Sequence, residues 1–182
     1  KIIKSAGVES RHVVSDSLKT SDLCHAAAEN LISQLGWSKD SIDLLVFVSQ
    51  TPDYQLPATS CILQDRLGLS KDVAAFDISL GCSGYVYGLQ VVSALITTGY
   101  KRALLLVGDS ISALVGKGDR STELLFGDAG SATALEVSDE GELSFVSGTD
   151  GSGHKNIIAY PDRNSQDKIL SNYNGLCSGA LS

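Results

Sequence analysis

The chain has 182 residues, 43% of them hydrophobic, so it is long enough and apolar enough to fold around a core of its own. Its formal net charge of -7 and the absence of a Lys and Arg cluster exclude the electrostatic footprint of a nucleic-acid-binding protein. Eighteen glycines and three prolines are typical of regular elements joined by tight turns, as in α/β folds.

The first clear element is a helix that begins near Thr20 or Ser21 and ends at Gly36. Its expected apolar face consists of Leu23, Ala27, Leu31 and Leu35. Cys24 and His25 also lie on this helix. They are interpreted as surface or packing residues, because no second Cys or His follows at metal-binding spacing.

A near-continuous apolar run at 42–48 predicts a parallel strand covered on both faces. Residues 49–57 then form a loop, and loops at the carboxyl ends of such strands build binding sites. Pro57 is compatible with the first turn of a helix that runs to Leu67 and stops at Gly68. Ile62, Leu63 and Leu67 are expected to form the apolar side of that helix.

A single thiol, Cys82, stands between an apolar strand-like run at 73–78 and a run of helical period that ends near Gly99. Gly81 and Gly84 flank it, as a sharp strand-to-helix turn requires. A helix N-terminus favours thiolate over thiol, and the thiolate is the nucleophile. The Cys82 N–H would also provide one donor of an oxyanion hole.

Two other interpretations of this stretch remain open at the level of the turn alone. Cys82 could be a small buried apolar residue, as most free cysteines are. The uncharged run 78–100 could be a membrane span, but its serines, threonines and four glycines disfavour one.

Another apolar strand is expected at 103–107, so helices and strands alternate along the chain. This alternation predicts an α/β fold with right-handed crossovers and a mostly parallel sheet between helices. Two further strands are expected at 131–137 and 143–147, which makes a five-stranded mixed sheet. Asp128 is interpreted as a turn residue in Asp-Ala-Gly, with an acid beside the site as the alternative.

Residues 1–150 are therefore expected to form one α/β domain, and 151–182 an irregular tail or the start of a connection. His154 in this region is interpreted as a loop residue rather than a catalytic base. The four cysteines are far apart, which predicts a reduced, cytoplasmic protein with neither a metal knuckle nor a redox pair. Residues 1–11 lack the apolar core of a signal peptide, and the absence of methionine suggests a partial chain.

Several ordered motifs between about Gly7 and Gly151 resemble the β-ketoacyl-acyl-carrier-protein synthase III branch of the thiolase-like condensing enzymes. They are GVESRH at 7–12, FDISLGCSGYVYGL at 76–89, GDRST at 118–122 and LLFGDAGSATAL at 124–135. The resemblance implies a thiolase-like layered fold of which this chain is the N-terminal half.

The resemblance also implies a decarboxylative Claisen condensation without a permanently bound cofactor or metal. Cys82 would take an acyl group from coenzyme A, and a malonyl group on acyl carrier protein would lose carbon dioxide and attack it. Arg120 would lie near the coenzyme A entrance, and Phe126 would shape the acyl channel. Leu56 stands where the family places a gate residue that reaches the partner subunit of a homodimer. Tyr85 and Tyr87 are expected to line the acyl pocket with Leu56 and Phe126.

The family takes its catalytic His and Asn from the C-terminal half, and His12, His25 and His154 do not match that histidine. We therefore expect these residues alone to accept an acyl group without completing a condensation. The aromatic and basic residues that begin the family's coenzyme A site also have no match, since Lys1 and Ser5 fall there.

Two alternative functions remain open. One is another thiolase-like acyl transfer, such as that of hydroxymethylglutaryl-coenzyme A synthase. The other is a non-catalytic partner subunit of a condensing-enzyme dimer, which the retained Cys82 disfavours.

Overall fold

The computed structural model describes residues 7–115, 122–141, 143–156 and 158. The chain divides into two compact units. The larger unit consists of Val14–Asp109 and Ala129–Phe145, and the smaller of Lys1–Val13, Ser110–Asp128 and Val146–Ser182.

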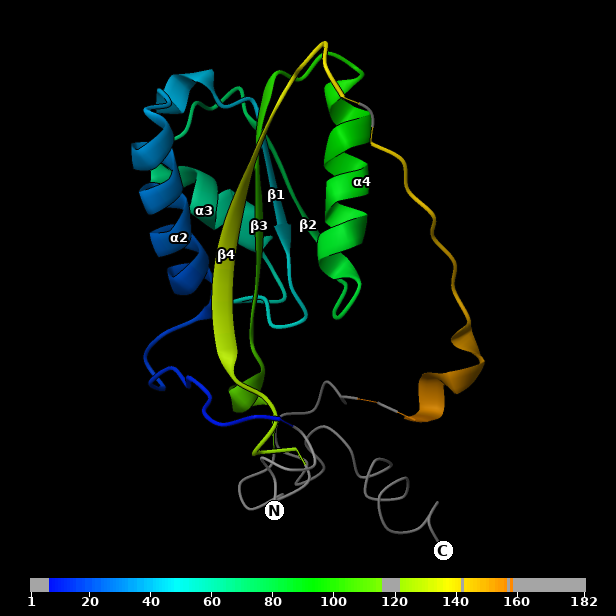
Figure 1. The fold of residues 1–182 in the computed structure, drawn as a ribbon. Helices are drawn as coiled ribbons and strands as arrows, with labels where there is room; N and C mark the ends of the chain where they lie inside the picture. Colours follow the sequence, from blue (N-terminus) through cyan, green and yellow to red (C-terminus); the bar gives the residue numbers. More distant parts are fainter. Residues whose placement is uncertain (1–6, 116–121, 142, 157, 159–182) are drawn as a thin grey trace, which may run out of the picture. The chain divides into compact units, whose positions relative to one another are not determined.

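Within the described residues, four strands form one sheet in the order β2-β1-β3-β4 (Figure 1). Their bounds are Leu44–Val48 for β1, Ala74–Ile78 for β2, Arg102–Ser110 for β3 and Asp128–Glu136 for β4. β1 is parallel to both neighbours, with Leu44 opposite Ala74 on β2 and Ala103 on β3. The predicted crossovers are therefore present.

β4 runs antiparallel to β3, which makes the sheet mixed, as expected. The Val137 N–H donates to the Lys101 carbonyl at 2.9 Å, just beyond one end of the pair. Ser131 Oγ donates to the Val107 carbonyl at 2.9 Å, nearer the other end. Residue numbers therefore rise along β4 as they fall along β3.

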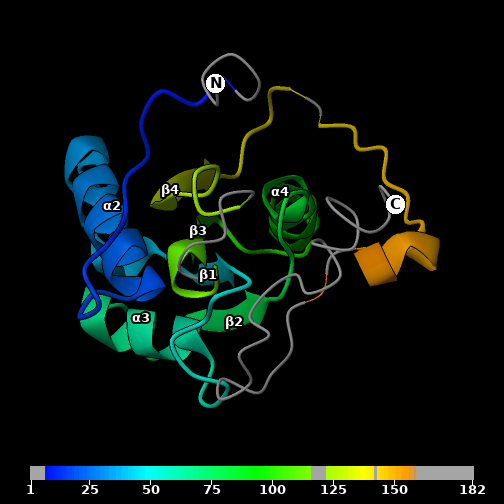
Figure 2. The same cartoon turned by 90° about the horizontal axis from the view of Figure 1, so that it is seen from below.

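Helices cover both faces of the sheet, as Figure 2 shows with the sheet seen end on. The helices α2 (Thr20–Leu35) and α3 (Thr59–Leu67) lie on one face, and α4 (Gly84–Ile96) lies on the other. Leu45 and Phe47 of β1 join the core cluster on the α2 and α3 side, whereas Val46 joins the cluster on the α4 side. Every residue of β1 is buried, which is why its sequence is a continuous apolar run.

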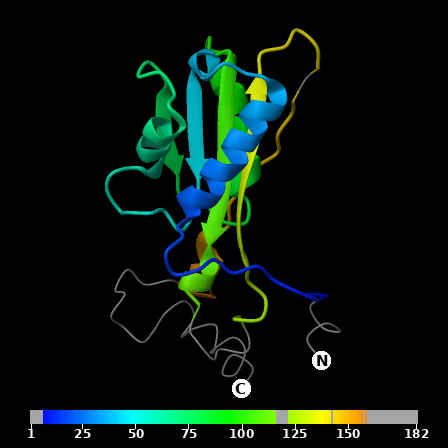
Figure 3. The same ribbon diagram turned by 90° about the vertical axis from the view of Figure 1, so that its left-hand side faces the viewer.

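The buried face of α2 lies one residue away from the predicted one. Cys24, Ala28 and Ile32 are buried at helical spacing, while Leu35 is 46% exposed. Figure 3 shows α2 crossing β3 and β4. Small residues at the crossing let the helix approach the sheet closely, and so Cys24 is a packing residue.

α3 begins at Thr59 rather than at Pro57 because a strand provides its cap. The Asp77 carboxylate of β2 accepts hydrogen bonds from the backbone N–H groups of Thr59 at 2.7 Å and Ser60 at 2.8 Å. These are helix N-terminal donors without an intrahelical partner, and a carboxylate also suits the helix dipole there.

Two predictions for residues 128–147 are wrong. Asp128 is not a turn residue but the first residue of β4. It is buried, and its carboxylate accepts hydrogen bonds from the Ser112 N–H at 2.9 Å and from Ser112 Oγ at 2.5 Å. The expected strand at 143–147 is irregular, and Leu143 is 67% exposed because no neighbouring strand pairs with it in the described residues. The sheet there has four strands rather than five.

The smaller unit is held together by its own hydrogen bonds. The Asp128 N–H donates to the His12 carbonyl at 2.8 Å, and the Arg11 guanidinium donates to the Phe126 carbonyl at 3.2 Å. Gly151–Asn156 form a short 3-10 helix that includes His154. In the part of the chain that is described, no helix combines the length and the apolar character needed to cross a bilayer.

Candidate active site

The predicted strand, turn and helix around Cys82 are present in the structure. β2 ends at Ile78, α4 begins at Gly84, and Cys82 stands two residues ahead of the helix. The Gly84 N–H donates to the Gly81 carbonyl at 2.7 Å, which closes a tight turn around Cys82 and Ser83. Cys82 is exposed rather than buried, so the interpretation as a core residue is wrong.

The start of α4 rests directly on the sheet. A Cβ at Gly84 would lie 2.8 Å from Val48 Cγ1, which is closer than real Cβ contacts. Any larger residue at position 84 would therefore lift the first turn of α4 away from β1. Glycine there seats the helix N-terminus, and with it Cys82, at the carboxyl end of β1.

The other described cysteines differ from Cys82 in different ways. Burial raises the pKa of Cys24 to about 12, so this thiol stays protonated and inert at neutral pH. Cys61 is exposed on the first turn of α3, where the N–H groups of Thr59 and Ser60 already bind the Asp77 carboxylate. Exposure alone thus separates Cys82 from Cys24 but not from Cys61.

We expect iodoacetamide to label Cys82 faster than Cys61, and to label Cys24 only after unfolding. The physical reason is that Cys82 precedes the first turn of α4, whereas the N–H groups at the start of α3, beside Cys61, already bind the Asp77 carboxylate. The N-terminus of α3 is therefore already occupied by a negative charge. Timed alkylation followed by peptide mass spectrometry measures the three rates. Labelling of Cys61 as fast as Cys82 in the folded protein would contradict the assignment.

The loop after β1 is anchored by a residue that the sequence analysis did not single out, Asp109 at the end of β3. Its Oδ1 accepts hydrogen bonds from Ser49 Oγ at 2.9 Å, the Gln50 N–H at 2.7 Å and the Thr51 N–H at 3.1 Å. Thr51 Oγ1 donates to the same oxygen at 3.0 Å. The signal in the sequence was a carboxylate directly after a buried strand, opposite a polar loop after the neighbouring strand.

Replacing Asp109 by Ala should lower the free energy of unfolding by about 2–4 kcal/mol. Several donors lose an ionised acceptor at once, and each unmet group costs about 1 kcal/mol or more. Urea denaturation measures the change. The matched control is Asp72→Ala, at an exposed aspartate, which should change stability by less than about 0.5 kcal/mol. Equal effects of the two substitutions would contradict the anchoring role.

The remaining predicted site residues fall into three groups. Tyr85 and Tyr87 lie on the first turn of α4 beside Cys82, but residues two apart on a helix do not share a face. Tyr85 is 42% exposed and its hydroxyl accepts from Thr133 Oγ1 at 3.4 Å, while Tyr87 is half-buried. Leu56 is 84% exposed in the loop before α3, next to a cis bond to Pro57.

Phe126 and Arg120 belong to the smaller unit. Phe126 is 43% exposed and follows a turn at 122–125. Arg120 lies outside the described residues, and so does Cys177. The roles of Phe126 and Arg120 in a substrate site therefore stay predictions.

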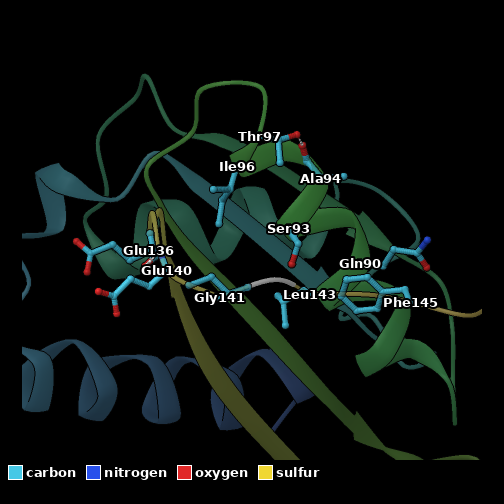
Figure 4. A pocket seen from close by; sticks show the side chains of 12 residues that line it. Gln90, Ser93, Ala94, Ile96, Thr97, Glu136, Glu140, Gly141, Leu143 and Phe145 are labelled. Atoms are coloured by element: carbon cyan, nitrogen blue, oxygen red, sulfur yellow. Dashed lines mark hydrogen bonds between the residues drawn. The ribbon is translucent and has the colours of Figure 1, made fainter.

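A separate hollow of about 740 Å³ lies between α4 and the chain that follows β4 (Figure 4). Gln90, Ser93 and Thr97 line one side of it, and Glu136, Leu143 and Phe145 line the other. None of the predicted site residues that the structure describes lines this hollow. Among the described residues, no cluster of three or more His, Cys, Asp or Glu side chains is arranged to hold a metal ion.

The chain is similar in sequence and in structure to enzymes of one family. The sequence profile described as 3-oxoacyl-[acyl-carrier-protein] synthase III matches residues 76–151, a range that includes Cys82. The β-ketoacyl-[acyl-carrier-protein] synthase III of Sulfurovum sp. (strain NBC37-1) is 41% identical over 147 residues, which are 80% of this chain and 43% of that protein. A putative 3-oxoacyl-[acyl-carrier-protein] synthase 3 of Campylobacter jejuni is 37% identical over 155 residues, 85% of this chain and 44% of that protein.

Solved structures agree with this similarity. The crystal structure of a 3-oxoacyl-(acyl-carrier protein) synthase from Burkholderia xenovorans LB400 superposes with a TM-score of 0.85 at 40% identity. The match covers 100% of this chain and 56% of that one. The chain thus spans about half the length of the relatives that it matches.

Proposed function

The chain belongs to the 3-oxoacyl-[acyl-carrier-protein] synthase III family of thiolase-like condensing enzymes, and we propose that it carries the acyl-accepting half of such an enzyme's active site. The observation that supports this proposal is the position of Cys82. The thiol is exposed at a strand-to-helix turn, two residues ahead of the first residue of α4. An accessible thiol ahead of a helix is one of the arrangements that support nucleophilic acyl transfer.

In the proposed first step, the Cys82 thiolate attacks the thioester carbonyl of an acyl-coenzyme A. A bond forms between Sγ and the carbonyl carbon, and the negative charge moves to the carbonyl oxygen. The Cys82 N–H would donate to that oxygen, as one of the donors of an oxyanion hole. The carbon–sulfur bond to coenzyme A then breaks, and coenzyme A leaves as a thiolate that takes a proton from water.

In the proposed second step, a malonyl group on acyl carrier protein attacks the acyl-Cys82 thioester. Loss of carbon dioxide from the malonyl group leaves an enolate, whose carbon bonds to the acyl carbonyl carbon. The bond to Sγ breaks, which returns the Cys82 thiolate and releases a 3-oxoacyl group on the carrier. Further donors are needed to stabilise the enolate, and the relatives extend over about twice the length spanned here.

The other site residues keep the roles that the resemblance implies. Arg120 would bind coenzyme A phosphates at the entrance, because a guanidinium suits phosphate oxygens. Leu56, Tyr85, Tyr87 and Phe126 would line the acyl channel. We also propose a homodimer located in the cytoplasm. The 84% exposure of Leu56 supports its role as a gate residue that reaches a partner subunit.

The test of this function is formation of an acyl-Cys82 adduct. The purified protein is incubated with acetyl-, butyryl- and hexanoyl-coenzyme A, and the peptide that contains Cys82 is analysed by mass. We expect the corresponding acyl increment on Cys82 and none on Cys61. An unmodified Cys82 with every donor would overturn the proposal. Discharge by an acetyl-coenzyme A acceptor rather than a malonyl carrier would indicate another thiolase-like chemistry.

Replacing Phe126 by Ala should shift preference toward longer acyl donors, by about tenfold in the ratio of kcat/KM for hexanoyl over acetyl. The reason is that a smaller side chain leaves room for additional methylene groups, each worth about 0.8 kcal/mol when buried. Competition between the two donors, read by mass, measures the ratio. An unchanged ratio would count against Phe126 as a wall of the channel.

A further inference from the structure

Gln50, in the loop after β1, contacts the turn at residues 81–84 that carries Cys82, called here the nucleophile turn. Its carboxamide lies against Gly81, the residue before Cys82. A Cβ at position 81 would lie 2.5 Å from Gln50 Cδ and 2.9 Å from Nε2, and would overlap Oε1. Real Cβ atoms essentially never come this close to another heavy atom, so the contact as it stands requires glycine at position 81.

The backbone that carries Gln50 is firmly held. Its N–H donates to Asp109 Oδ1 at 2.7 Å, and the same oxygen accepts from the residues on both sides of Gln50. The loop is therefore fixed to the end of β3, although the Gln50 residue is exposed. Because the backbone of Gln50 is fixed and its side chain contacts Gly81, Gln50 can restrict the position of the turn that carries Cys82.

We propose that Gln50 is a positioning residue for Cys82, an inference that rests on the proposed role of Cys82 as the acyl acceptor. The carboxamide packs against Gly81 and limits how the turn between β2 and α4 can move, so it holds the thiol in one place ahead of the helix. Gln50 acts here through the turn, by contact, and takes no proton from the thiol. Gly81 and Gln50 are thus a matched pair, in which the absent side chain of one makes room for the other.

Three variants test the pair: Gly81→Ala, Gln50→Ala and the double variant. The first readout is the iodoacetamide alkylation rate of Cys82, with Cys61 in the same sample as an internal reference. The second is the rate constant and KM for acylation by acetyl-coenzyme A. Gln55→Ala, at another exposed glutamine of the same loop, is the matched control.

We expect each single variant to slow both reactions of Cys82 by about tenfold, because small displacements of a reacting group have large effects on rate. The Gln50 carboxamide is the end of a flexible side chain. The methyl group of Gly81→Ala is therefore expected to displace the carboxamide rather than to unfold the turn. The double variant should therefore also be slowed about tenfold, not a hundredfold. KM, Cys61 and the Gln55→Ala protein should stay within about twofold of the parent.

Gln50→Met provides a rescue, since it keeps the length of the side chain but removes the amide. Because Gln50→Met keeps the contact with Gly81, we expect it to retain at least half of the parent alkylation rate of Cys82. If Gly81→Ala fails to fold, the comparison of Gln50→Met with Gln50→Ala still tests the positioning role.

Additive effects of the two single substitutions, equal slowing of Cys61, or equal rates for Gln50→Met and Gln50→Ala would each overturn the positioning role. Failure of the proposed function would look different. Cys82 would then take no acyl group even in the parent protein, while the order of alkylation rates among the variants would persist.

Discussion

Replacing Cys82 by Ala is expected to abolish acyl transfer, with a loss of at least about a thousandfold in the rate of thioester cleavage. The covalent acyl-enzyme cannot form without the thiol, and the remaining N–H donors of the turn can only polarise the thioester toward water. Release of coenzyme A from the acyl donor, followed with a thiol reagent, measures the rate.

The control is Cys61→Ala, which removes the other exposed cysteine of the described residues and should keep full activity. Both variants should keep the far-ultraviolet circular dichroism and thermal midpoint of the parent, because an exposed side chain contributes little to the core. Thioester cleavage by Cys82→Ala at more than a tenth of the parent rate would show that another group accepts the acyl chain.

A large effect on stability is expected from Gly108→Ala, which should lower the free energy of unfolding by about 3 kcal/mol. Gly108 lies on β3 where α2 crosses the sheet, and a Cβ there would lie 2.6 Å from the Ala129 carbonyl oxygen. It would also lie 2.9 Å from both Cys24 Sγ and Gly130 Cα. Since two of these three atoms belong to the backbone, a rotamer change cannot relieve the overlap.

Gly130→Ala should be destabilising by a similar amount, because its Cβ would lie 2.6 Å from the Cys24 backbone nitrogen. Gly151→Ala is the matched control, at a glycine where a Cβ would meet nothing within 4 Å, and should change stability by less than about 0.5 kcal/mol. Urea denaturation of the three proteins tests the pair. A loss below 1 kcal/mol for Gly108→Ala would show that α2 can move away from the sheet at little cost.

Local sequence patterns predict the order of the helices and strands, but not every side chain that is buried in the core. Alternating strands and helices were predictable because the parallel strands β1, β2 and β3 are mostly apolar runs and each helix ends at a glycine or close to one. Both are local signals. The buried face of α2 was not, since it runs through Cys24 and Ala28 rather than through the leucines. Small side chains were selected there because the helix crosses β3 and β4 at glycines, a fact about two surfaces that meet.

Asp128 and Asp109 show the same limit for polar residues. Asp-Ala-Gly is an ordinary turn sequence, yet Asp128 opens β4 and binds Ser112, sixteen residues earlier in the chain. Asp109 binds residues nearly sixty positions away. No local pattern contains either partner, because folding brings them together.

The sequence by itself determined the strand-to-helix turn around Cys82 and the alternating order of the elements, because short-range periodicity and glycine placement encode these. Only the tertiary structure decided that Gln50 packs on Gly81, that Asp77 caps α3 and that residues 143–147 stay unpaired. Each of these depends on which segments become neighbours across the sheet. Such contacts join segments that are distant in the chain, so no local sequence pattern predicts them.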